Sequence, residues 1–325
     1  MLKTVLTMKI LITGGSGFVG TNLAAYLAAR GHELVAVGRD RRGATVFSNL
    51  FTWDQLDRID WAGVDAVIHL AGKAHDTRNT TSPQAYFDVN VGLTQIIVDA
   101  CVRSGGTGPK AFVLFSSVKA VADRVDDMLC EDAVPSPHTP YGKSKLEAEK
   151  VVRTAFAGES SATRSYILRP CMIHGPGNKG NLNRLYRIVQ QGVPWPFGAF
   201  ENRRSFASIG NVCAAVEALL ATHAPAGVYQ VADDEPLATN DVVRLIAESL
   251  DREPRIWRVP ASLVRAVART GDLLHLPLDS ERLKKLTESY VVSNEKLKHA
   301  LAWQRMPVEA RDGLRQTLAS FAGER

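Results

Sequence analysis

One short segment near the N-terminus constrains the fold of this chain more than any other. Lys9–Thr13 (KILIT) is an apolar, β-branched run, and it leads into a loop with glycines at 14, 17 and 20. A helical pattern follows to about Arg30. Such glycines permit a tight turn, close approach of backbone amides to a pyrophosphate, and packing of helix on strand. A strand, a glycine turn and a helix in this order are typical of a dinucleotide-binding unit. The spacing is G-x-x-G-x-x-G, not the shorter G-x-G-x-x-G.

Strand and helix patterns alternate through the first half of the chain. This alternation predicts an α/β fold with a parallel, doubly wound (Rossmann) sheet, whose ligands bind at the carboxyl ends of its strands. Expected strands are Lys9–Thr13, Glu33–Val37, Ala66–His69, Ala111–Phe115 and Ser165–Leu168, and expected helices are Phe18–Arg30, Pro83–Arg103 and Tyr141–Ala157.

The composition changes near residue 170, where loops rich in glycine, asparagine and proline begin. We therefore expect a dinucleotide-binding domain over residues 1–170 and an interleaved, smaller and mostly helical substrate part over residues 171–325. Phe206–Ile209 and Val228–Val231 look like strands that return to the first sheet, so that region (about 205–232) belongs with the first domain.

Composition excludes several classes of protein. With 325 residues and 45% hydrophobic content the chain can bury a large core, and no run approaches 18 apolar residues, so no membrane-spanning segment is expected. The net charge of +5 suits an anionic substrate, and no basic stripe with interleaved aromatics supports nucleic-acid binding. Four cysteines show neither C-x-x-C pairing nor metal spacing, which indicates free thiols in a reducing cytosol and no metal site: Cys101, Cys130, Cys171 and Cys213.

A second motif carries acid–base chemistry. Tyr141 and Lys145 are four residues apart in Tyr-Gly-Lys-Ser-Lys, and the pair Ser116-Ser117 precedes them. On a helix this spacing places both side chains on one face, about 6 Å apart along the axis. An unperturbed phenol has a pKa of about 10, and a neighbouring ammonium is expected to lower it. Tyr141 could then exchange a proton with a hydroxyl while hydride moves at the same carbon.

These motifs together resemble one family over nearly all of the chain. The chain is similar to extended short-chain dehydrogenases/reductases of the nucleotide-sugar epimerase, dehydratase and reductase group. Besides the glycine loop, Ser116-Ser117 and Tyr141 to Lys145, the resemblance rests on His69 to Gly72, Tyr86 to Asn90, Arg169-Pro170, Arg203 to Phe206 and Ser293 to Trp303.

The resemblance implies roles for individual residues. Ser117 would hydrogen-bond the reacting hydroxyl, with Ser116 as the adjacent alternative, and Tyr141 would be the general acid/base. Lys145 would also bind the nicotinamide ribose, and Asn90 would order water or backbone near it. The remaining residues expected to line the cofactor are Gly14, Gly17, Phe18, Val19, Gly20, Leu70, Ala71 and Gly72.

The end of the second strand bears on the choice of cofactor. An NAD site usually has Asp or Glu there, to bind the adenosine ribose. By register from the glycine loop, Gly38 or Arg39 takes that position, with Asp40 just beyond. An arginine can bind a 2′-phosphate through two hydrogen bonds. This favours NADP(H), while NAD(H) remains possible if Asp40 reaches the ribose.

Substrate contacts also follow from the resemblance. Asn181 and Leu182 match the stretch that lines a uridine diphosphate, and Arg204 and Arg282 match two arginines that clamp the diphosphate. Lys119 either reaches the substrate or is solvated. Cys171-Met172 stands where the family often has an asparagine, which suggests a different sugar. The histidines at 69, 75 and 174 are expected to be structural.

Two reactions at carbon 4 share these residues: reduction of a 4-keto sugar by NADPH, and 4-epimerisation with tightly held NAD. Arg39 favours the reductase. Val118-Lys119 replaces the Asp-Glu of 4,6-dehydratases, and a non-catalytic cofactor-binding regulator would be expected to lack Tyr141 or Lys145. The resemblance further implies a UDP-linked or polyprenyl-diphosphate-linked N-acetyl sugar for surface polysaccharides, a cytoplasmic enzyme and a homodimer built on its two long central helices.

One further segment, Arg255 to Leu276, mixes apolar side chains with arginines. It is either an amphipathic helix packed on the smaller part of the protein, which we favour, or a helix that lies on a membrane surface.

Overall fold

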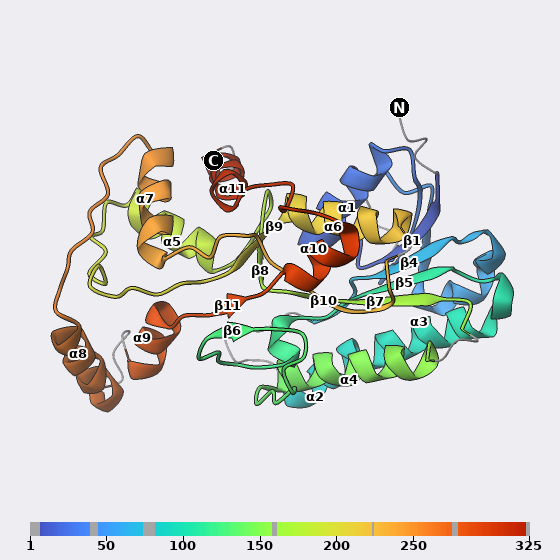
Figure 1. Cartoon of the computed structure of the whole chain (residues 1–325), viewed down its shortest axis with the longest axis horizontal. Coiled ribbons are helices and arrows are strands. Elements are labelled where there is room, and N and C mark those ends of the chain that lie inside the picture. The colour runs from blue at the N-terminus through green and yellow to red at the C-terminus, as the bar shows by residue number, and fades with distance from the viewer. Residues whose placement is uncertain are drawn as a thin grey trace.

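The computed structural model describes residues 7–39, 45–73, 82–157, 161–222, 224–274 and 279–322. Its centre is a parallel sheet of seven strands in the order β10-β7-β5-β4-β1-β2-β3 (Figure 1). The strands are β1 (Lys9–Thr13), β2 (Glu33–Gly38), β3 (Asn49–Thr52), β4 (Ala66–His69), β5 (Ala111–Phe115), β7 (Arg164–Pro170) and β10 (Gly227–Val231). The predicted doubly wound α/β fold is confirmed.

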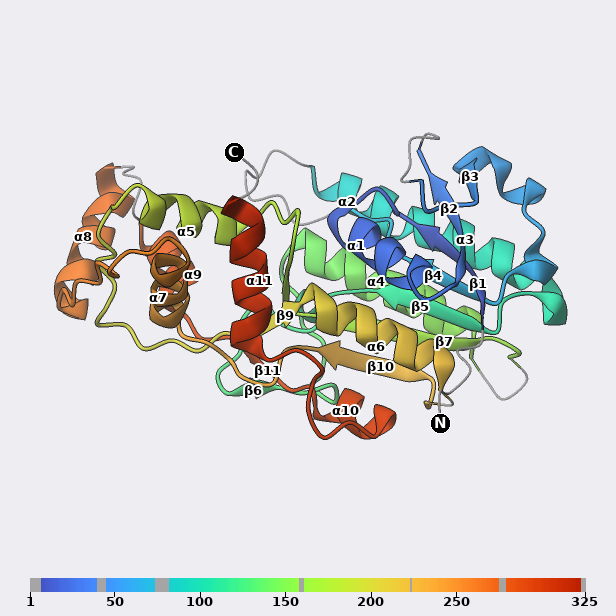
Figure 2. The ribbon, with the colours of Figure 1, turned by 90° about the horizontal axis from the view of Figure 1, so that it is seen from above.

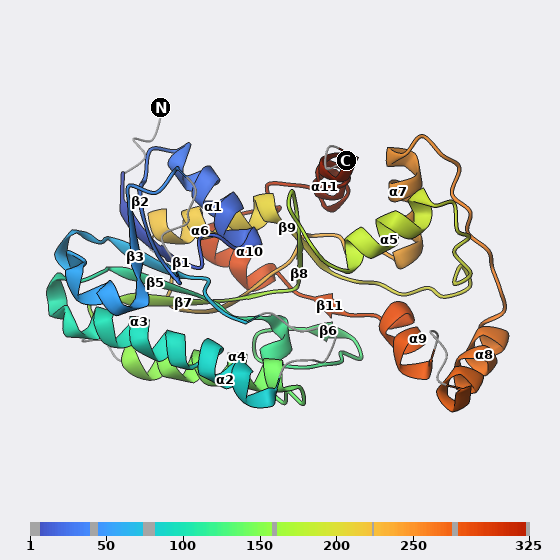
Figure 3. The same cartoon turned by 180° about the vertical axis from the view of Figure 1, so that it is seen from behind.

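Helices cover both faces of this sheet (Figures 1 and 3). One face packs against α1 (Phe18–Ala28), α6 (Ile209–Ala221) and α10 (Glu295–Leu301), around a core that includes Ile10, Leu23 and Val212. The other face packs against α3 (Gly92–Arg103) and α4 (Pro140–Ala155), and α2 (Pro83–Asn90) packs on both of these helices. Buried β-branched and leucine side chains on both faces of every central strand explain the near-continuous apolar runs in the sequence.

The apolar stretch Pro83–Arg103 has 21 residues and is long and apolar enough to span a membrane by length and composition, since it contains an 18-residue window with a mean hydropathy of 1.2. In the structure this stretch is α2 followed by α3, which meet at Val91. Ile97 and Val98 of α3 are buried against the sheet. Packing in the core therefore accounts for part of its apolar character, since 39% of the window is buried.

Strand boundaries agree closely with the sequence prediction, because β1, β4 and β5 begin and end at the predicted residues. One prediction is wrong. Phe206–Ile209 does not return to the large sheet: β9 (Phe206–Ser208) pairs with β8 (Met172–His174) in a separate two-stranded sheet. Of the two expected returning strands, only β10 joins the seven-stranded sheet, next to β7.

The second hydrophobic core lies beyond β8 and β9 (Figure 2). It is formed by side chains of α5 (Asn181–Gln190), α7 (Thr239–Ser249), α8 (Ala261–Leu274), α9 (Ser280–Thr287) and α11 (Ala310–Ala322). A small pair of strands, β6 (Met128–Leu129) and β11 (Val291–Val292), connects this helical part to the loops that follow β5. After residue 170 the chain thus passes back and forth between the seven-stranded sheet domain and the helical part.

Candidate active site

The glycine loop turns at the carboxyl end of β1 and passes directly into α1. Gly14 has φ +73°, and a Cβ at this position would lie 2.7 Å from the amide nitrogen of Ala71. At Gly20 a Cβ would collide with the carbonyl oxygen of Gly14. Only glycine combines this backbone conformation with this closeness to the chain after β4. Gly17, the N-cap residue immediately before α1, is exposed to solvent.

A matched pair of glycine substitutions separates crowding from backbone conformation. Gly31 also has a positive φ, +86°, but nothing lies within 4 Å of a Cβ there. Gly31→Ala should cost about 1 kcal/mol through strain alone. Gly14→Ala should cost clearly more, about 3 kcal/mol, because the added methyl also meets Ala71. Urea unfolding measures both, and equal losses would show that closeness to Ala71 is unimportant.

The predicted cofactor residues after β4 lie against this loop. The amide of Leu70 donates to the carbonyl of Thr13 (3.1 Å), and the amide of Ala71 donates to the Thr13 hydroxyl (3.1 Å). A Cβ on Gly72 would lie 2.9 Å from Asn90 Oδ1 and 3.2 Å from Lys145 Nζ. The glycine loop, the Leu70–Gly72 segment and Lys145 are thereby brought to one edge of the sheet.

Asn90 is buried and orders the backbone beside Gly72. Its Oδ1 accepts a hydrogen bond from the Lys73 amide (2.7 Å), and its Nδ2 donates to Ser144 Oγ (2.9 Å) and to the Lys73 carbonyl (3.3 Å). Ser144 precedes Lys145 on α4. Asn90 therefore connects the segment after β4 to the helix of the candidate acid–base pair, which agrees with the backbone-ordering role expected for it.

The start of α1 has the features of an anion site. No side chain caps this helix at Gly17, so its first amides are available to a phosphate, and the helix dipole adds partial positive charge. Phe18 and Val19 follow and are half-buried. The sequence analysis missed Phe47, a buried ring that a Cβ at Gly15 would meet at 2.6 Å. Its position after β2 gave no local signal of this contact.

Ser117 and Tyr141 meet through a side-chain hydrogen bond at the carboxyl end of β5. Ser117 follows the buried strand and also accepts from the Lys119 amide (3.2 Å). Tyr141 lies in the first turn of α4, where Thr139 caps the helix by accepting from the Gly142 amide (3.2 Å). A Cβ on Gly142 would collide with the carbonyl of Lys119. Gly142, which the sequence analysis passed over, thus lets α4 approach the segment that carries Ser117.

The two serines of the pair have different partners. Ser116 Oγ donates to Glu149 Oε1 (2.5 Å), while Ser117 faces Tyr141. Geometry therefore favours Ser117 over Ser116 for contact with a reacting hydroxyl. The ring of Tyr86 on α2 packs edge-on against that of Tyr141, with centroids 6.1 Å apart.

A buried ion pair lies one helical turn from Lys145. Arg169 donates two hydrogen bonds to Glu149, from Nε to Oε1 (2.8 Å) and from Nη2 to Oε2 (2.6 Å), and both side chains are at most 1% exposed. Glu149 is one helical turn after Lys145 on α4. Sequence analysis assigned no role to this pair. Its parts lie 20 residues apart, on a helix and a strand, so no local pattern could reveal it.

Burial controls the two candidate acid–base groups. It raises the pKa of the Tyr141 phenol above its usual value of about 10, and the hydrogen bond with Ser117 opposes this only in part. Burial also lowers the pKa of Lys145 to about 8, against the opposite influence of the Glu149 carboxylate. The prediction that Lys145 lowers the pKa of Tyr141 is wrong here, because Lys145 Nζ donates to the carbonyl of Phe115 (2.9 Å) and burial of the phenol dominates.

Arg39 directly follows Gly38, the last residue of β2, and is exposed. This end of β2 adjoins the glycine loop, because the Gly14 amide donates to the carbonyl of Val37 (3.3 Å). The arginine therefore lies at the predicted edge of the cofactor site. Asp40, the alternative ribose ligand, lies outside the described residues.

The expected substrate residues fall into two groups. Lys119 is neither free in solvent nor directed at an open surface: its Nζ donates to the carbonyl of Asp123 (2.9 Å) and lies 4.2 Å from the ring centre of Tyr290. Asn181 is exposed at the first position of α5, whereas the side chain of Leu182 is buried in the second core. Only the backbone of Leu182 can therefore face a ligand.

The two candidate diphosphate arginines differ in burial. Arg204 is half-buried, its Nε donates to the carbonyl of Glu288 (3.1 Å), and burial lowers its pKa. Arg282 lies in the first turn of α9 with 61% of its side chain exposed, and its Nε is 3.4 Å from Asp279. Arg203, the neighbour of Arg204, is exposed.

Two of the three histidines are structural, as expected. His69 is buried between the hydroxyls of Thr13 (2.7 Å) and Thr94 (3.0 Å), and burial lowers its pKa to about 3. His174 is buried beside Thr317 (2.9 Å) and Asp233 (3.5 Å). His75 lies outside the described residues. Within the described ranges no group of three or more His, Cys, Asp or Glu side chains is arranged to hold a metal ion.

These residues fit a nicotinamide dinucleotide. The glycine cradle excludes any Cβ at positions 14 and 20, and the uncapped start of α1 suits a pyrophosphate. Gly72 lies between Asn90 and Lys145, where any side chain would collide. Such a cofactor supplies or accepts a hydride, and the neighbouring Ser117–Tyr141 pair can move the accompanying proton.

Comparison with known proteins also indicates a protein that binds a nicotinamide dinucleotide. Residues 10–232 match the model of the NAD dependent epimerase/dehydratase family. The chain is 30% identical over 327 aligned residues to a UDP-glucose 4-epimerase of Vibrio cholerae, covering 96% of this chain and 95% of that protein. It is 29% identical to an N-acetyl-α-D-glucosaminyl-diphospho-ditrans,octacis-undecaprenol 4-epimerase of Escherichia coli O157:H7 (78% and 76% covered). It is 28% identical to a GDP-6-deoxy-D-mannose reductase of Pseudomonas aeruginosa (81% and 87% covered).

Solved structures share the fold. The enzyme WbmG of Bordetella bronchiseptica, solved with NAD, superposes with a TM-score of 0.75 at 20% identity, covering 100% of this chain and 97% of that one. The RMD protein of Pseudomonas aeruginosa, solved with NADPH, gives 0.73 at 23% identity (98% and 100% covered). Family model, full-length relatives and fold agree: this chain is an enzyme of the NAD dependent epimerase/dehydratase family, within the extended short-chain dehydrogenases/reductases.

Proposed function

We propose that this enzyme transfers a hydride at carbon 4 of a nucleotide-linked sugar, and that it acts as an NADPH-dependent 4-keto-sugar reductase. The observation that carries the proposal is the hydrogen-bonded Ser117–Tyr141 pair, placed beside Lys145 and the glycine cradle. Relatives of known activity include both 4-epimerases and a nucleotide-sugar reductase. The proposed catalytic residues are Ser117, Tyr141 and Lys145.

Tyr141 has the protonation state that the proposed reduction requires. Because burial raises the pKa of this phenol, it stays protonated at neutral pH, which is the form that can donate a proton to a carbonyl oxygen. Ser117 would orient that oxygen. In the proposed reaction the hydride adds to carbon 4, the C=O bond becomes a C–O single bond, and Tyr141 supplies the proton. Lys145 would hold the nicotinamide ribose, since its ammonium lies next to Gly72.

Arg39 supports NADPH over NADH, because an exposed guanidinium at the end of β2 can bind a 2′-phosphate. Arg39→Ser should weaken NADPH binding by about tenfold or more, the loss of one charge-assisted contact. Binding of NADH should change little. Titration calorimetry with both coenzymes measures this, and Arg58→Ser, at another exposed arginine, is the matched control. An equal loss for both coenzymes would contradict the role of Arg39.

A second candidate is a 4-epimerase with tightly held NAD, supported by the 30% identity to the Vibrio cholerae UDP-glucose 4-epimerase over almost its whole length. An epimerase regenerates its cofactor, whereas a reductase must exchange it. Freshly purified protein, denatured by heat, distinguishes the two. Stoichiometric NAD in the supernatant would favour the epimerase, and an empty protein that binds NADPH more tightly than NADH would support the reductase.

The substrate follows from the same relatives. A UDP-linked N-acetyl sugar, or a polyprenyl-diphosphate-linked one, would be clamped by Arg204 and Arg282 and lined by Asn181 and the backbone of Leu182. Lys119 would contact it after moving away from Tyr290. We place the reaction in the cytoplasm, in the synthesis of surface-polysaccharide precursors. We also propose a homodimer in which α3 and α4 of each copy form the interface.

A further inference from the structure

The helix α8 has two apolar faces, and only one of them is covered. Val264, Ala268 and Gly271 are buried in the second core. Leu263, Val267 and Leu274 are 48–63% exposed, and spacings of four and seven residues place them on a single stripe of the helix. Leu273 beside them is 81% exposed. Packing within the protein accounts for the first face but not for the second.

Exposed apolar side chains concentrate in this region. Of the twelve large hydrophobic side chains that are exposed among the described residues, five belong to residues 257–274: Trp257, Leu263, Val267, Leu273 and Leu274. Isolated exposed apolar residues are ordinary, but five of them within one short segment mark an interaction surface. This group is called the α8 surface below.

The segment that carries the α8 surface is positively charged. Residues 255–274 contain four arginines and one aspartate, and all four arginines are exposed: Arg255, Arg258, Arg265 and Arg269. On a helical projection Arg269 lies next to Leu273, and Arg265 lies on the side of the helix opposite the stripe of Leu263, Val267 and Leu274. Two of them have neutral partners, because Arg255 donates to the carbonyl of Gly192 and Arg265 lies over the ring of Phe200. Asp272 is engaged by Ser280.

We infer that the α8 surface docks on an anionic lipid bilayer. Leucines and an exposed tryptophan, with arginines on another side of the helix and in the segment before it, are the composition of a helix that lies in the plane of a membrane interface. A second copy of this chain fits less well, since a two-fold contact would place the arginines of one copy against those of the other. From the sequence, membrane contact by this segment was the less favoured alternative. The uncovered second face of α8, which supports it, is visible only in the folded protein.

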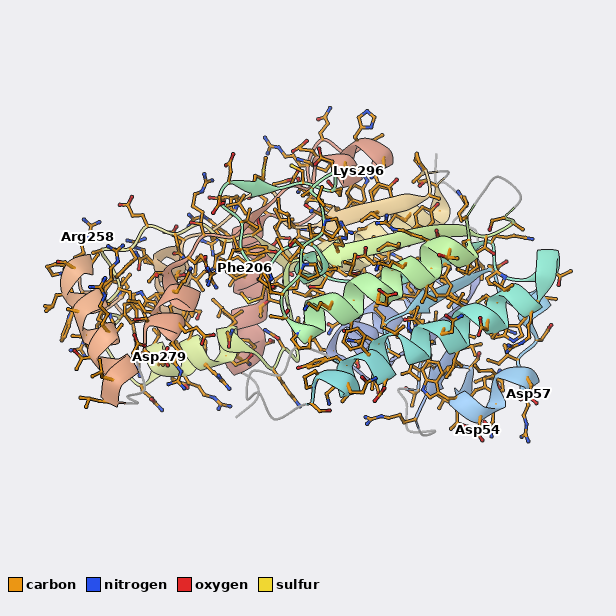
Figure 4. All side chains as sticks on the ribbon, turned by 90° about the horizontal axis from the view of Figure 1, so that it is seen from below. Asp54, Asp57, Phe206, Arg258, Asp279 and Lys296 are labelled. Carbon is orange, nitrogen blue, oxygen red and sulfur yellow. The ribbon has the colours of Figure 1, made fainter. Side chains whose placement is uncertain are left out.

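The position of α8 allows this contact. The helix lies at the end of the molecule remote from the seven-stranded sheet, and α9 lies between it and β11 (Figures 1 and 2). Arg258 marks the same extremity in Figure 4, with Asp279 at the start of α9 nearby. A flat bilayer could therefore approach without meeting the sheet. Since α9 packs on α8 and carries Arg282, such docking would bring the proposed diphosphate site close to lipid headgroups. The docking itself does not depend on the proposed reaction.

Vesicle co-sedimentation of the full-length protein tests the inference. The protein should sediment with vesicles of equal parts phosphatidylglycerol and phosphatidylcholine and much less with pure phosphatidylcholine, and added salt should weaken the binding. Leu263→Gln/Leu274→Gln should reduce the partition coefficient by about tenfold or more. Val134→Gln/Met128→Gln, which changes two exposed apolar residues elsewhere, is the matched control and should bind as wild type.

Charge is tested separately. Arg265→Gln/Arg269→Gln should weaken binding to the anionic vesicles by about tenfold, with Arg58→Gln/Lys110→Gln as the control pair of exposed cations. The inference is overturned if the wild-type protein does not sediment with anionic vesicles, or if the leucine double variant binds as well as wild type. It is also overturned if that variant instead converts a dimer to a monomer in light scattering, which would assign the α8 surface to a second copy. Because these readouts require no turnover, they stand whether or not the proposed reaction is correct.

Discussion

Replacement of Tyr141 by phenylalanine is expected to lower kcat by about 10²–10⁴-fold while the affinity for the cofactor stays within a few-fold of wild type. The substitution removes only the hydroxyl, which is the proposed proton donor, and keeps the ring that packs against Tyr86. Steady-state rates and coenzyme titration on the same preparation measure the two effects. Unchanged turnover would remove Tyr141 from the chemistry.

The adjacent serines provide a matched test of the same site. Ser117→Ala removes the hydrogen bond with Tyr141 and should lower kcat by about tenfold to a hundredfold. Ser116→Ala removes a bond to Glu149 instead, so its main effect should be on the free energy of unfolding. A larger loss of kcat in Ser116→Ala than in Ser117→Ala would show that the assignment is off by one residue.

The second large effect concerns stability. Arg169→Leu should lower the free energy of unfolding by about 3–5 kcal/mol, because it leaves the carboxylate of Glu149 buried without its main partner. Arg153 also contacts Glu149, at 3.5 Å, but 53% of its side chain is exposed. Arg153→Leu should therefore cost only about 0–1 kcal/mol. Urea denaturation compares the two variants, and similar losses would show that burial does not set the strength of this ion pair.

Elements that depend on local pattern could be predicted from the sequence. Each of the strands β1, β4 and β5 is a short apolar run with polar or glycine residues at or just after its end. Signals of this kind lie within a few residues along the chain, so the predicted strand boundaries agree with the structure. The spacing of Tyr141 and Lys145 likewise placed both on one helix, whereas the expected place of Ser117 beside them followed from the resemblance to the family.

Features that depend on distant contacts could not be predicted. β9 has the composition of a sheet strand, but its partner is β8, and only the folded chain shows that this pair stands apart from the main sheet. The pKa of Tyr141 follows the burial of its phenol, which helix spacing does not report. Glu149 is an ordinary polar residue of an amphipathic helix until Arg169 on β7 is brought against it.

The most direct test of the proposed reaction follows the hydride itself. The enzyme is incubated with a UDP-linked 4-keto sugar and NADPH carrying deuterium at carbon 4 of the nicotinamide, and the product is examined by NMR. The proposal predicts one deuterium at carbon 4 of the sugar for each NADPH oxidised, and no transfer with Tyr141→Phe. Deuterium that remains on the cofactor, with the keto sugar unchanged, would contradict reduction at this carbon.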